Sequence, residues 1–320
     1  VQTLSPVTIN EKNEYPGNTK TENKETASIG EVVTYTVTVT IPETVAEKDI
    51  NVVDTITNGL TLNTAITVAG DENPTEASRI TSLTFTQTGT VAAQEAVAAD
   101  PQADPPVEAQ PAVKAATVYT ATIPAATVKA NAGKTLTLTY TATVNSNAVV
   151  NDAEKNDAHI EYDHYVSKDV EVGVETHAFT LKKIDGADVT NGMTDEQKFA
   201  LDALDGAEFS LWTAAENGTQ IYVKKVGDVY RADVSKTVDN DTNKPDVIEA
   251  GEATIEGLAA GTYYLQEDKA PTGYNPLTER QPITVSATTS ANGVDIAVEN
   301  NSGPPLPSTG GIGTPIFYVV

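Results

Sequence analysis

The feature that most constrains the fold is a strict alternation of apolar residues with threonine. The segment VVTYTVTVTI at residues 32–41 shows it first, and TLTLTYTATV at residues 135–144 repeats it. A period of two gives a strand one face for the core and one for water, and β-branched and aromatic residues suit a half-buried sheet. Turn clusters at Gly30, Gly133 and Gly261 separate such runs. The pattern therefore predicts an all-β chain built as sandwiches.

The composition excludes several classes of function. The 320 residues carry 20 Lys+Arg against 45 Asp+Glu, a formal net charge of −25, so binding to nucleic acid or to anionic lipid is not expected. There is no cysteine, which removes disulfides, thiolate zinc sites and cysteine nucleophiles. Three histidines are few for an imidazole metal site, and no triad or phosphate-binding motif is recognisable. We therefore expect no cofactor, no metal and no enzymatic activity.

Three parts of the chain are predicted from changes in composition. A polar, extended stretch near residues 166–178 separates two groups of strands, so residues 1–175 and 176–302 are each predicted to form a domain. Residues 303–320 are a tail that begins rich in Pro and Gly. The length allows two or three domains. The chain starts with Val1 and shows no charged-then-apolar leader, so we expect a processed protein or a fragment.

Two segments depart from the strand pattern. Residues 92–116 are rich in alanine, proline and acid, which predicts a long exposed excursion between two strands. A tolerated insertion is the favoured interpretation, and a partner-binding arm is the alternative. A short helix is predicted at residues 194–204, where Thr194 and Gln197 have the spacing of a capping box.

The C-terminal tail holds a five-residue motif: Leu306, Pro307, Ser308, Thr309 and Gly310. It resembles the LPxTG sorting signal of Gram-positive surface proteins, in which Pro keeps the peptide extended and Gly exposes the scissile carbonyl. The resemblance implies that a sortase cleaves between Thr309 and Gly310 and passes the Thr309 carbonyl to an amine. The apolar run after the motif has nine residues. A membrane span needs ~20, so the hydrophobic tail of the signal is expected to be cut short.

Residues 179–301 resemble the Cna-B domain of surface adhesins and pilins. The matching segments, in chain order, are FTLKKIDG, LDGAEFSLW, GLAAGTYYLQEDKAPTGY and IAVENNSG. The resemblance implies a spontaneous Lys–Asn isopeptide bond assisted by a buried acid. Burial favours the neutral, nucleophilic form of a lysine, and a buried carboxyl group can protonate the amide carbonyl. Fixed neighbours supply the effective concentration that this slow reaction needs.

Alternation selects the reacting residues of this domain. Lys183 has the parity of the apolar residues before it, whereas Lys182 points the other way. By the same argument, Asn300 is preferred over Asn301 as the acceptor. Glu267 shares a face with an apolar neighbour and is the predicted acid. The prediction is a Lys183–Asn300 bond that forms with the help of Glu267.

Residues 5–165 resemble the isopeptide-forming domain found in the shafts of Gram-positive pili. The resemblance rests on ASIGEVVTYTVTVTIPE, INVVDTITNGLTL, GKTLTLTYTATVNSNAVV and KNDAHIEYDHY. It implies Asp54 as the catalytic acid and Asn156 as the acceptor. Both have the parity of apolar neighbours, as burial requires.

The lysine of the first domain is less clearly marked. It is expected in the first strand, and Lys12 is the preferred candidate. Lys12 is out of phase with Val7 and Ile9 unless a bulge intervenes. Lys20 and Lys24, in a more turn-like stretch, are the alternatives.

Together these resemblances imply a major (backbone) pilin of a Gram-positive sortase-assembled pilus, with two tandem immunoglobulin-like (Cna-type) β-sandwich domains. Its expected place is the cell surface, anchored to the cell wall. Its expected partners are a pilin-class sortase, neighbouring pilin subunits in a covalent homopolymer, and cell-wall peptidoglycan, with a host surface as a further option. The alternative is a sortase-anchored adhesin that binds host matrix or glycan.

Residues 15–18 depart from the pilin pattern. Shaft pilins carry a lysine, usually in a YPKN-like motif, that receives the next subunit, and this chain has YPGN instead. The linking lysine is therefore expected on an N-terminal domain missing from this sequence. The alternatives are that the protein is not a shaft subunit, or that Lys12 or Lys20 is the linking lysine.

Overall fold

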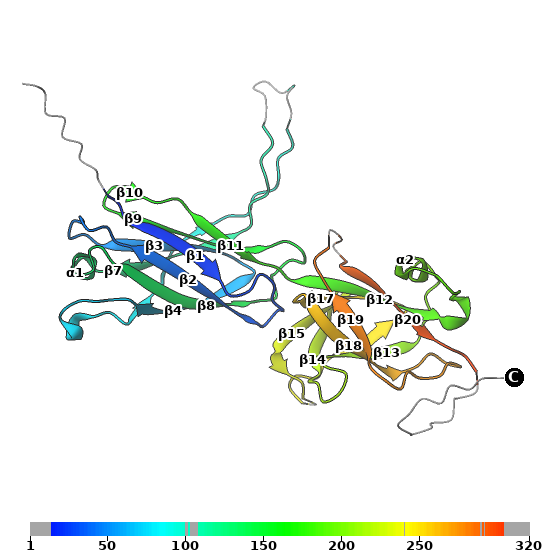
Figure 1. The fold of residues 1–320 in the computed structure, drawn as a ribbon. Helices are drawn as coiled ribbons and strands as arrows, with labels where there is room; N and C mark the ends of the chain where they lie inside the picture. Colours follow the sequence, from blue (N-terminus) through cyan, green and yellow to red (C-terminus); the bar gives the residue numbers. More distant parts are fainter. Residues whose placement is uncertain are drawn as a thin grey trace, which may run out of the picture.

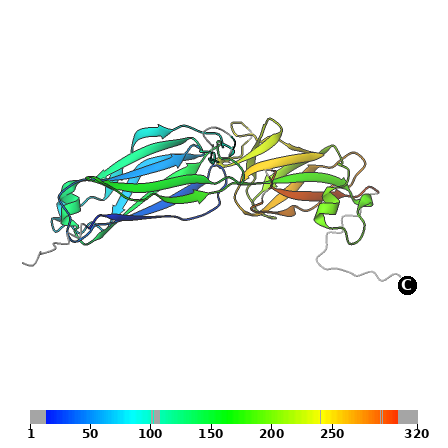
Figure 2. The same cartoon turned by 90° about the horizontal axis from the view of Figure 1, so that it is seen from above.

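The chain folds into two β-sandwiches that lie end to end and give the molecule an elongated shape (Figure 1, Figure 2). The computed structural model describes residues 14–99, 102, 108–239, 241–288, 290 and 292–303. Each sandwich has its own hydrophobic cluster, one drawn from residues 27–174 and the other from residues 179–298. The prediction of an all-β chain of two tandem sandwiches is confirmed.

Two sheets face each other in the first sandwich. The strand order in one sheet is β1 (Gly17–Glu22), β2 (Val32–Thr40), β8 (Thr135–Val144), β4 (Leu60–Ala69) and β5 (Ser82–Thr84). The order in the other is β10 (Tyr165–Val166), β9 (Glu154–Tyr162), β3 (Ile50–Thr57), β7 (Ala116–Ile123) and β6 (Thr86–Val91). Strand β11 (Val170–Val174) also pairs with β9, and η1 (Glu76–Ser78) and α1 (Ala125–Ala130) lie in the connections.

The alternating segments of the sequence form the centre of the first sheet. Strands β2 and β8 pair in antiparallel register, with Tyr35 opposite Tyr140 and Val37 opposite Leu138. These four side chains are buried, whereas the threonines between them are half-buried on the outer face. The period of two therefore determines which residues of these strands form the core.

The second sandwich also consists of two sheets. The strand order in one sheet is β14 (Ile221–Val226), β15 (Val229–Thr237), β17 (Glu252–Leu258), β12 (His177–Asp185) and β20 (Val294–Asn300). The order in the other is β16 (Ile248–Ala250), β13 (Ala207–Trp212), β18 (Gly261–Lys269) and β19 (Gln281–Val285). A short 3-10 helix, η2 (Gly186–Asp188), follows β12 directly.

The predicted helix forms, but it is shorter than expected. Helix α2 spans Asp195–Phe199. The Gln197 N–H donates to the Thr194 hydroxyl, and the Thr194 N–H donates to the Gln197 side chain, so the capping box is confirmed. After the helix the chain turns towards β12, where the Leu204 N–H donates to the Lys183 carbonyl at 2.7 Å. Because Leu204 pairs with β12, the helix ends before this residue, at Phe199, and not at 204 as predicted.

A loop of the first sandwich docks on the second. The Ile29 N–H donates to the Gly257 carbonyl at 2.9 Å, and the Val234 N–H donates to the Ile29 carbonyl at 2.9 Å. The main-chain N–H and carbonyl of Ile29 thus bridge β17 and the neighbouring strand β15, which run parallel. Gly257 has a φ of +83°, and a Cβ there would lie 2.5 Å from Ile29 Cδ1. The contact therefore needs glycine both for its backbone angle and for the close approach.

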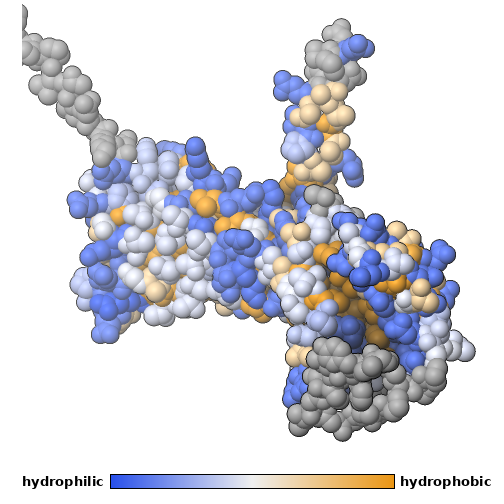
Figure 3. Space-filling view, turned by 45° about the vertical axis from the view of Figure 1, so that its right-hand side comes forward, coloured by the Kyte–Doolittle hydropathy of each residue, from blue (hydrophilic) through white to orange (hydrophobic). Residues whose placement is uncertain are grey.

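The excursion between β6 and β7 forms a two-stranded arm. Isolated antiparallel bridges join Gln94 to Val113 and Val97 to Gln110. The described residues from 92 to 113 are exposed, and the arm stands clear of both sandwiches (Figure 1, Figure 3). This agrees with the prediction of an exposed excursion between two strands.

Candidate functional site

Three strands of the second sandwich bring Lys183, Asn300 and Glu267 together. Strands β12 and β20 are parallel neighbours with Asp185 opposite Asn300, so Lys183 lies two residues away on the same face. Strand β18, in the other sheet, supplies Glu267. Lys183 Nζ lies 2.6 Å from Asn300 Oδ1 and 3.3 Å from Glu267 Oε1. The structure thus brings together the three residues that alternation selected.

The surroundings of Lys183 favour its neutral form. The side chains of Lys183 and Glu267 are fully buried, and Lys183 Nζ lies 5.6 Å from the centre of the Phe209 ring. Desolvation lowers the pKa of Lys183 to about 8, although the charge of Glu267 acts in the opposite direction. Asn300 Nδ2 donates to Glu267 Oε1 at 3.0 Å, and the Leu277 N–H donates to Glu267 Oε2 at 2.8 Å. The carboxyl group is therefore held between a main-chain N–H and the side-chain amide nitrogen.

The same three residue types meet between the two sheets of the first sandwich. Asp54 and Asn156 lie on the neighbouring strands β3 and β9, and Lys20 reaches them from β1 in the other sheet. Lys20 Nζ donates to Asp54 Oδ1 at 2.5 Å and to Asn156 Oδ1 at 2.6 Å. Lys20 is 4% exposed, and the other two residues are 0% exposed. The predicted acid and acceptor thus surround one buried amine.

The lysine at this site is Lys20, one of the two alternatives, and not the preferred candidate. Lys12 lies outside the described residues, and Lys24 forms a partly exposed ion pair with Glu31 at 3.2 Å. Lys20 is the one buried residue of β1, which pairs with β2 along its whole length and places Lys20 opposite Val37. The sequence of β1, GNTKTE, has no apolar alternation, so the strand is recognisable only from its pairing with β2.

Two tyrosines complete the first site, and their role there was not predicted. Lys20 Nζ lies 5.5 Å from the ring centre of Tyr35 and 5.6 Å from that of Tyr140. The Tyr140 hydroxyl donates to Asp54 Oδ1 at 2.6 Å. Burial lowers the pKa of Lys20 and raises the pKa of Asp54, although each charge favours the other. Both groups are therefore shifted towards their neutral forms, an amine and a carboxylic acid.

Each of the two sites contains the groups needed for an amide exchange. In both, the lysine nitrogen is in contact with the oxygen of an asparagine amide, so it faces the carbonyl that it would attack. A carboxyl group beside the pair can protonate the amide and pass a proton to departing ammonia. Burial and fixed positions raise the effective concentration of the amine. The arrangement is therefore suited to forming a Lys–Asn isopeptide bond.

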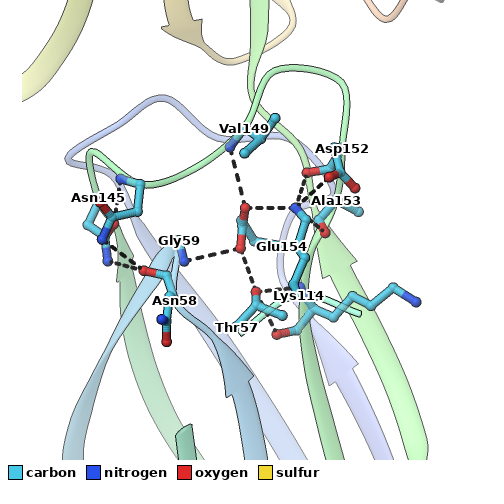
Figure 4. A network of polar contacts seen from close by, with 11 residues as sticks. Thr57, Asn58, Gly59, Lys114, Asn145, Val149, Asp152, Ala153 and Glu154 are labelled. Carbon is cyan, nitrogen blue, oxygen red and sulfur yellow. Dashed lines mark hydrogen bonds and ion pairs between the residues drawn. The ribbon is translucent and has the colours of Figure 1, made fainter. Parts of the chain in front are cut away.

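A third buried carboxylate, Glu154, has contacts of a different kind (Figure 4). It accepts hydrogen bonds from Thr57 Oγ1 at 2.5 Å, from the Gly59 N–H at 3.1 Å and from Lys114 Nζ at 2.8 Å. Lys114 Nζ also donates to two main-chain carbonyls, and its side chain is 25% exposed. These partners are a carboxylate and main-chain carbonyls, and none is an asparagine side chain, so Lys114 is not placed for the same amide exchange. This network connects β9 to the turn after β3 and is structural.

Other functional groups are few in the described part of the chain. Within it, no group of three or more acidic or histidine side chains is placed to hold a metal ion. No described helix is long and apolar enough to cross a membrane. A hollow of about 540 Å³ lies beside Glu267 and is also lined by Leu277 and Arg280. The side chains of Glu267 and Asp54 are both 0% exposed, so the acid of each site is shielded from solvent.

The predicted sorting signal cannot be compared with these sites. Its residues are Leu306, Pro307, Ser308, Thr309 and Gly310, and all five lie outside the described residues. Gly303, shortly after β20, is the last described residue. The signal therefore stays a prediction from the sequence.

The second sandwich matches a protein-family model. The family is described as a prealbumin-like fold domain (SpaA), and the match covers residues 178–302. This is nearly the segment that resembles the Cna-B domain in sequence. A comparison with curated proteins finds no match.

Solved structures of similar fold cover both sandwiches. The pilus 2b backbone protein of group B streptococcus is 24% identical with a TM-score of 0.54, over 90% of this chain and 99% of that one. The 35 kDa C-terminal fragment of the major pilin GBS80 of Streptococcus agalactiae is 20% identical with a TM-score of 0.59, over 90% and 100%. The major pilin BcpA of Bacillus cereus is 20% identical with a TM-score of 0.51, over 91% and 71%. The chain thus shares the fold of these pilus backbone proteins and major pilins.

Proposed function

We propose that this chain is a structural subunit of a covalently polymerised Gram-positive surface pilus, in which an internal isopeptide bond closes each sandwich. The bonds are Lys20–Asn156 and Lys183–Asn300. The observation that carries the proposal is that two separate cores each bury a lysine against an asparagine amide and a carboxyl group. The fold shared with pilus backbone proteins supports the same function.

In bond formation the lysine amine replaces ammonia at the side-chain amide of the asparagine. The neutral lysine Nζ attacks the amide carbon while Asp54 or Glu267, as a carboxylic acid, gives a proton to the amide. The bond between that carbon and the original amide nitrogen breaks. Ammonia leaves, and the proton that the lysine nitrogen loses returns to the carboxylate. One amine and one amide thus give a new amide and one ammonia molecule.

The bonds would protect the subunit against unfolding by force. Each joins the first strand of a sandwich to a late one, β1 to β9 and β12 to β20. Tension that enters at the first strand then passes through a covalent bond, so the long intervening segment cannot extend. The bonded residues are 136 and 117 positions apart in sequence. In the chain-entropy model for cross-links, closing loops of this length also stabilises each domain by about 5 kcal/mol.

Polymerisation is proposed to use the motif at residues 306–310. A pilin-class sortase would cleave after Thr309 and pass its carbonyl to an amine of the next subunit, and finally to peptidoglycan, which places the protein at the cell surface. In this scheme residues 1–175 are a shaft domain, residues 176–302 are a Cna-B type domain and residues 303–320 belong to the sorting signal.

The pilus function is tested by polymerisation in vitro. The chain with a complete sorting signal, incubated with its pilin-class sortase, is expected to give a ladder of SDS-resistant multimers. Thr309→Ala, which alters the residue whose carbonyl is transferred, is the control and should abolish the ladder. A wild-type protein that stays monomeric with an active sortase would contradict the shaft role. It would favour a surface adhesin, and the arm at residues 92–116 would then be the first surface to test.

A further inference from the structure

The two oxygens of Asp54 have unequal surroundings. Oδ1 accepts hydrogen bonds from Lys20 Nζ at 2.5 Å and from the Tyr140 hydroxyl at 2.6 Å. Oδ2 is buried and has no hydrogen-bond partner among the described residues, and the same is true of Asn156 Nδ2. One oxygen of the acid is therefore held in place, and the other is free to carry a proton.

The second site holds its acid in another way. The Leu277 N–H donates to Glu267 Oε2 at 2.8 Å, and Asn300 Nδ2 donates to both oxygens, at 3.0 Å and 3.2 Å. A main-chain N–H therefore anchors Glu267, on the oxygen other than the one nearest Lys183, whereas a side-chain hydroxyl anchors Asp54 on the oxygen that Lys20 contacts. A main-chain donor cannot be removed by substitution, but a phenol hydroxyl can.

We propose that Tyr140 is a positioning residue for the first isopeptide bond: its hydroxyl holds Asp54 Oδ1 beside Lys20 and leaves Oδ2 as the oxygen that carries the transferred proton. This rests on the proposed function of the site. Lys20 gives a proton to Asp54 and becomes the neutral nucleophile. The acid then protonates the Asn156 amide, whose nitrogen leaves as ammonia. Lys20 forms the new amide and gives its second proton back to the Asp54 carboxylate.

The surroundings of Tyr140 keep it a donor. It is 2% exposed, and its ring packs edge-on against Phe85 and beside Tyr35. Burial and the neighbouring Asp54 raise the pKa of Tyr140 well above its ordinary value, so the hydroxyl keeps its proton. The ring fixes the hydroxyl because a packed aromatic side chain has few alternative rotamers.

Tyr35 provides a matched control in the same site. Its ring lies as close to Lys20 Nζ as that of Tyr140, at 5.5 Å against 5.6 Å, and it is 0% exposed. Among the described residues its hydroxyl makes no hydrogen bond to Asp54, and Asn156 acts to lower the pKa of Tyr35 and of Tyr140 alike. Tyr35→Phe therefore removes a buried hydroxyl beside Lys20 without removing a hydrogen bond to Asp54. Tyr140→Phe removes the hydroxyl and that hydrogen bond.

The experiment follows both bonds in the same molecules. Chains made by cell-free translation are denatured at intervals, and peptide mapping measures the fraction that has lost ammonia at Asn156 and at Asn300. Formation of the second bond is the internal reference for the time that synthesis and folding take. In Tyr140→Phe the rate of first-bond formation, divided by that of the second bond, is expected to fall about tenfold. A fall of this size is expected from the loss of one buried hydrogen bond to a charged group. In Tyr35→Phe the ratio of the two rates should stay as in the wild type.

The pH dependence separates positioning from packing. The charged and titratable groups that act on Asp54 or on its partner Lys20 are Tyr140 on β8, Tyr35 on β2, Glu22 on β1 and Asp157 on β9. The hydrogen bond from Tyr140 favours the charged form of Asp54 and so lowers its pKa. Without this hydrogen bond, Asp54 stays protonated to higher pH. The pH at which formation of the first bond slows on the alkaline side should therefore rise. A packing defect would lower the rate equally at every pH.

The outcomes test the proposed function of the site and the role of Tyr140 separately. If neither bond forms in the wild type, the proposed function of the site is wrong. If both bonds form and Tyr140→Phe keeps the wild-type ratio and pH profile, or if Tyr35→Phe slows the first bond equally, the role of Tyr140 is wrong. If Tyr140→Phe does not fold, wild-type chains made with fluorotyrosine replace it, because fluorine changes the acidity of the hydroxyl with little change in shape. An unchanged ratio of the two bonds in those chains would overturn the proposal.

Discussion

Position on a strand face decides whether a lysine of this chain is a charged surface group or a nucleophile. Lys20 and Lys183 lie in the two cores beside aromatic rings, and desolvation lowers the pKa of both. Lys24 is only four positions after Lys20, but its side chain is 32% exposed and forms an ion pair with Glu31. Burial therefore determines which of these amines can react.

Lys20→Met is expected to remove the first bond, and Lys24→Met is expected to leave it intact. The reason is that Lys20 Nζ contacts the Asn156 amide, whereas Lys24 Nζ is engaged with Glu31. Peptide maps of the denatured proteins measure the difference. Wild type and Lys24→Met should contain a branched peptide that joins residues 20 and 156, and Lys20→Met should lack it. A branch at Lys12 or Lys24 in the wild type would show that the assignment is wrong.

A chain in which Lys183 stays unbonded should become more stable as the pH rises. In Asn300→Ala the lysine has no acceptor, and its folded pKa of about 8 lies below the ordinary 10.5. Between these two pH values the unfolded chain binds more protons than the folded one, so the free energy of unfolding rises with pH. The total rise is about 3 kcal/mol, complete near the ordinary pKa of lysine.

Urea unfolding below, within and above this pH window measures the effect. The wild type is the control, because its Lys183 is consumed in the bond and cannot titrate. Equal slopes of stability against pH in the two proteins would contradict a free, buried Lys183 in the variant.

Within a strand, the residues of a site can be predicted from the sequence where apolar and polar residues visibly alternate. Alternation in β12 and β20 selects Lys183 and Asn300 against their neighbours, and the structure buries both. Strand β1 is not predictable in this way, because Lys20 is its one buried residue and only the pairing with β2 turns it inward. The hydrogen bond from Tyr140 to Asp54 crosses from one sheet to the other. No local pattern encodes the distance between two sheets, so this contact could not be predicted.

The connection between β3 and β9 depends on a glycine. A Cβ at Gly59 would overlap the carboxyl group of Glu154, which is buried in the network of Figure 4. Gly59→Ala is therefore expected to destabilise the first sandwich by about 1–3 kcal/mol, the usual range for overpacking. Gly89→Ala in β6 is the control, since its Cβ would make only ordinary contact, 3.6 Å from Val118. Thermal unfolding measures both, and equal melting temperatures for the two variants would refute the role of Gly59.

At the scale of the whole molecule, several contacts hold the two sandwiches in one orientation. Besides the bonds of Ile29 to Gly257 and Val234, Arg231 Nη1 donates to the Ser146 carbonyl at 2.6 Å. Asn151 Nδ2 donates to the Ser290 carbonyl at 2.8 Å. Force along the molecule would pass from β1 through the proposed Lys20–Asn156 bond to β9 and on along the chain to β12. The contacts between the sandwiches are not part of that route. They would resist bending of the rod, while the isopeptide bonds would resist its extension.

Gly257→Ala is expected to loosen this junction. The clash of the new Cβ with Ile29 Cδ1 should broaden the range of orientations measured by small-angle X-ray scattering. Gly273→Ala is the control, because its φ of +89° imposes the same backbone strain while nothing lies within 4 Å of its Cβ. Adding Ile29→Ala, which removes Cδ1 and also Cγ1 at 3.0 Å from the new Cβ, should restore the wild-type scattering. Wild-type scattering from Gly257→Ala alone would mean that the junction does not depend on this contact.

The intact mass of the purified, denatured chain shows whether both lysine–asparagine pairs have reacted. The wild type is predicted to weigh two ammonia molecules less than its sequence. Asp54→Asn and Glu267→Gln, each lacking one acid, are predicted to lose only one. A wild-type mass equal to that of the sequence would contradict both proposed bonds, because both buried lysines would then be unreacted.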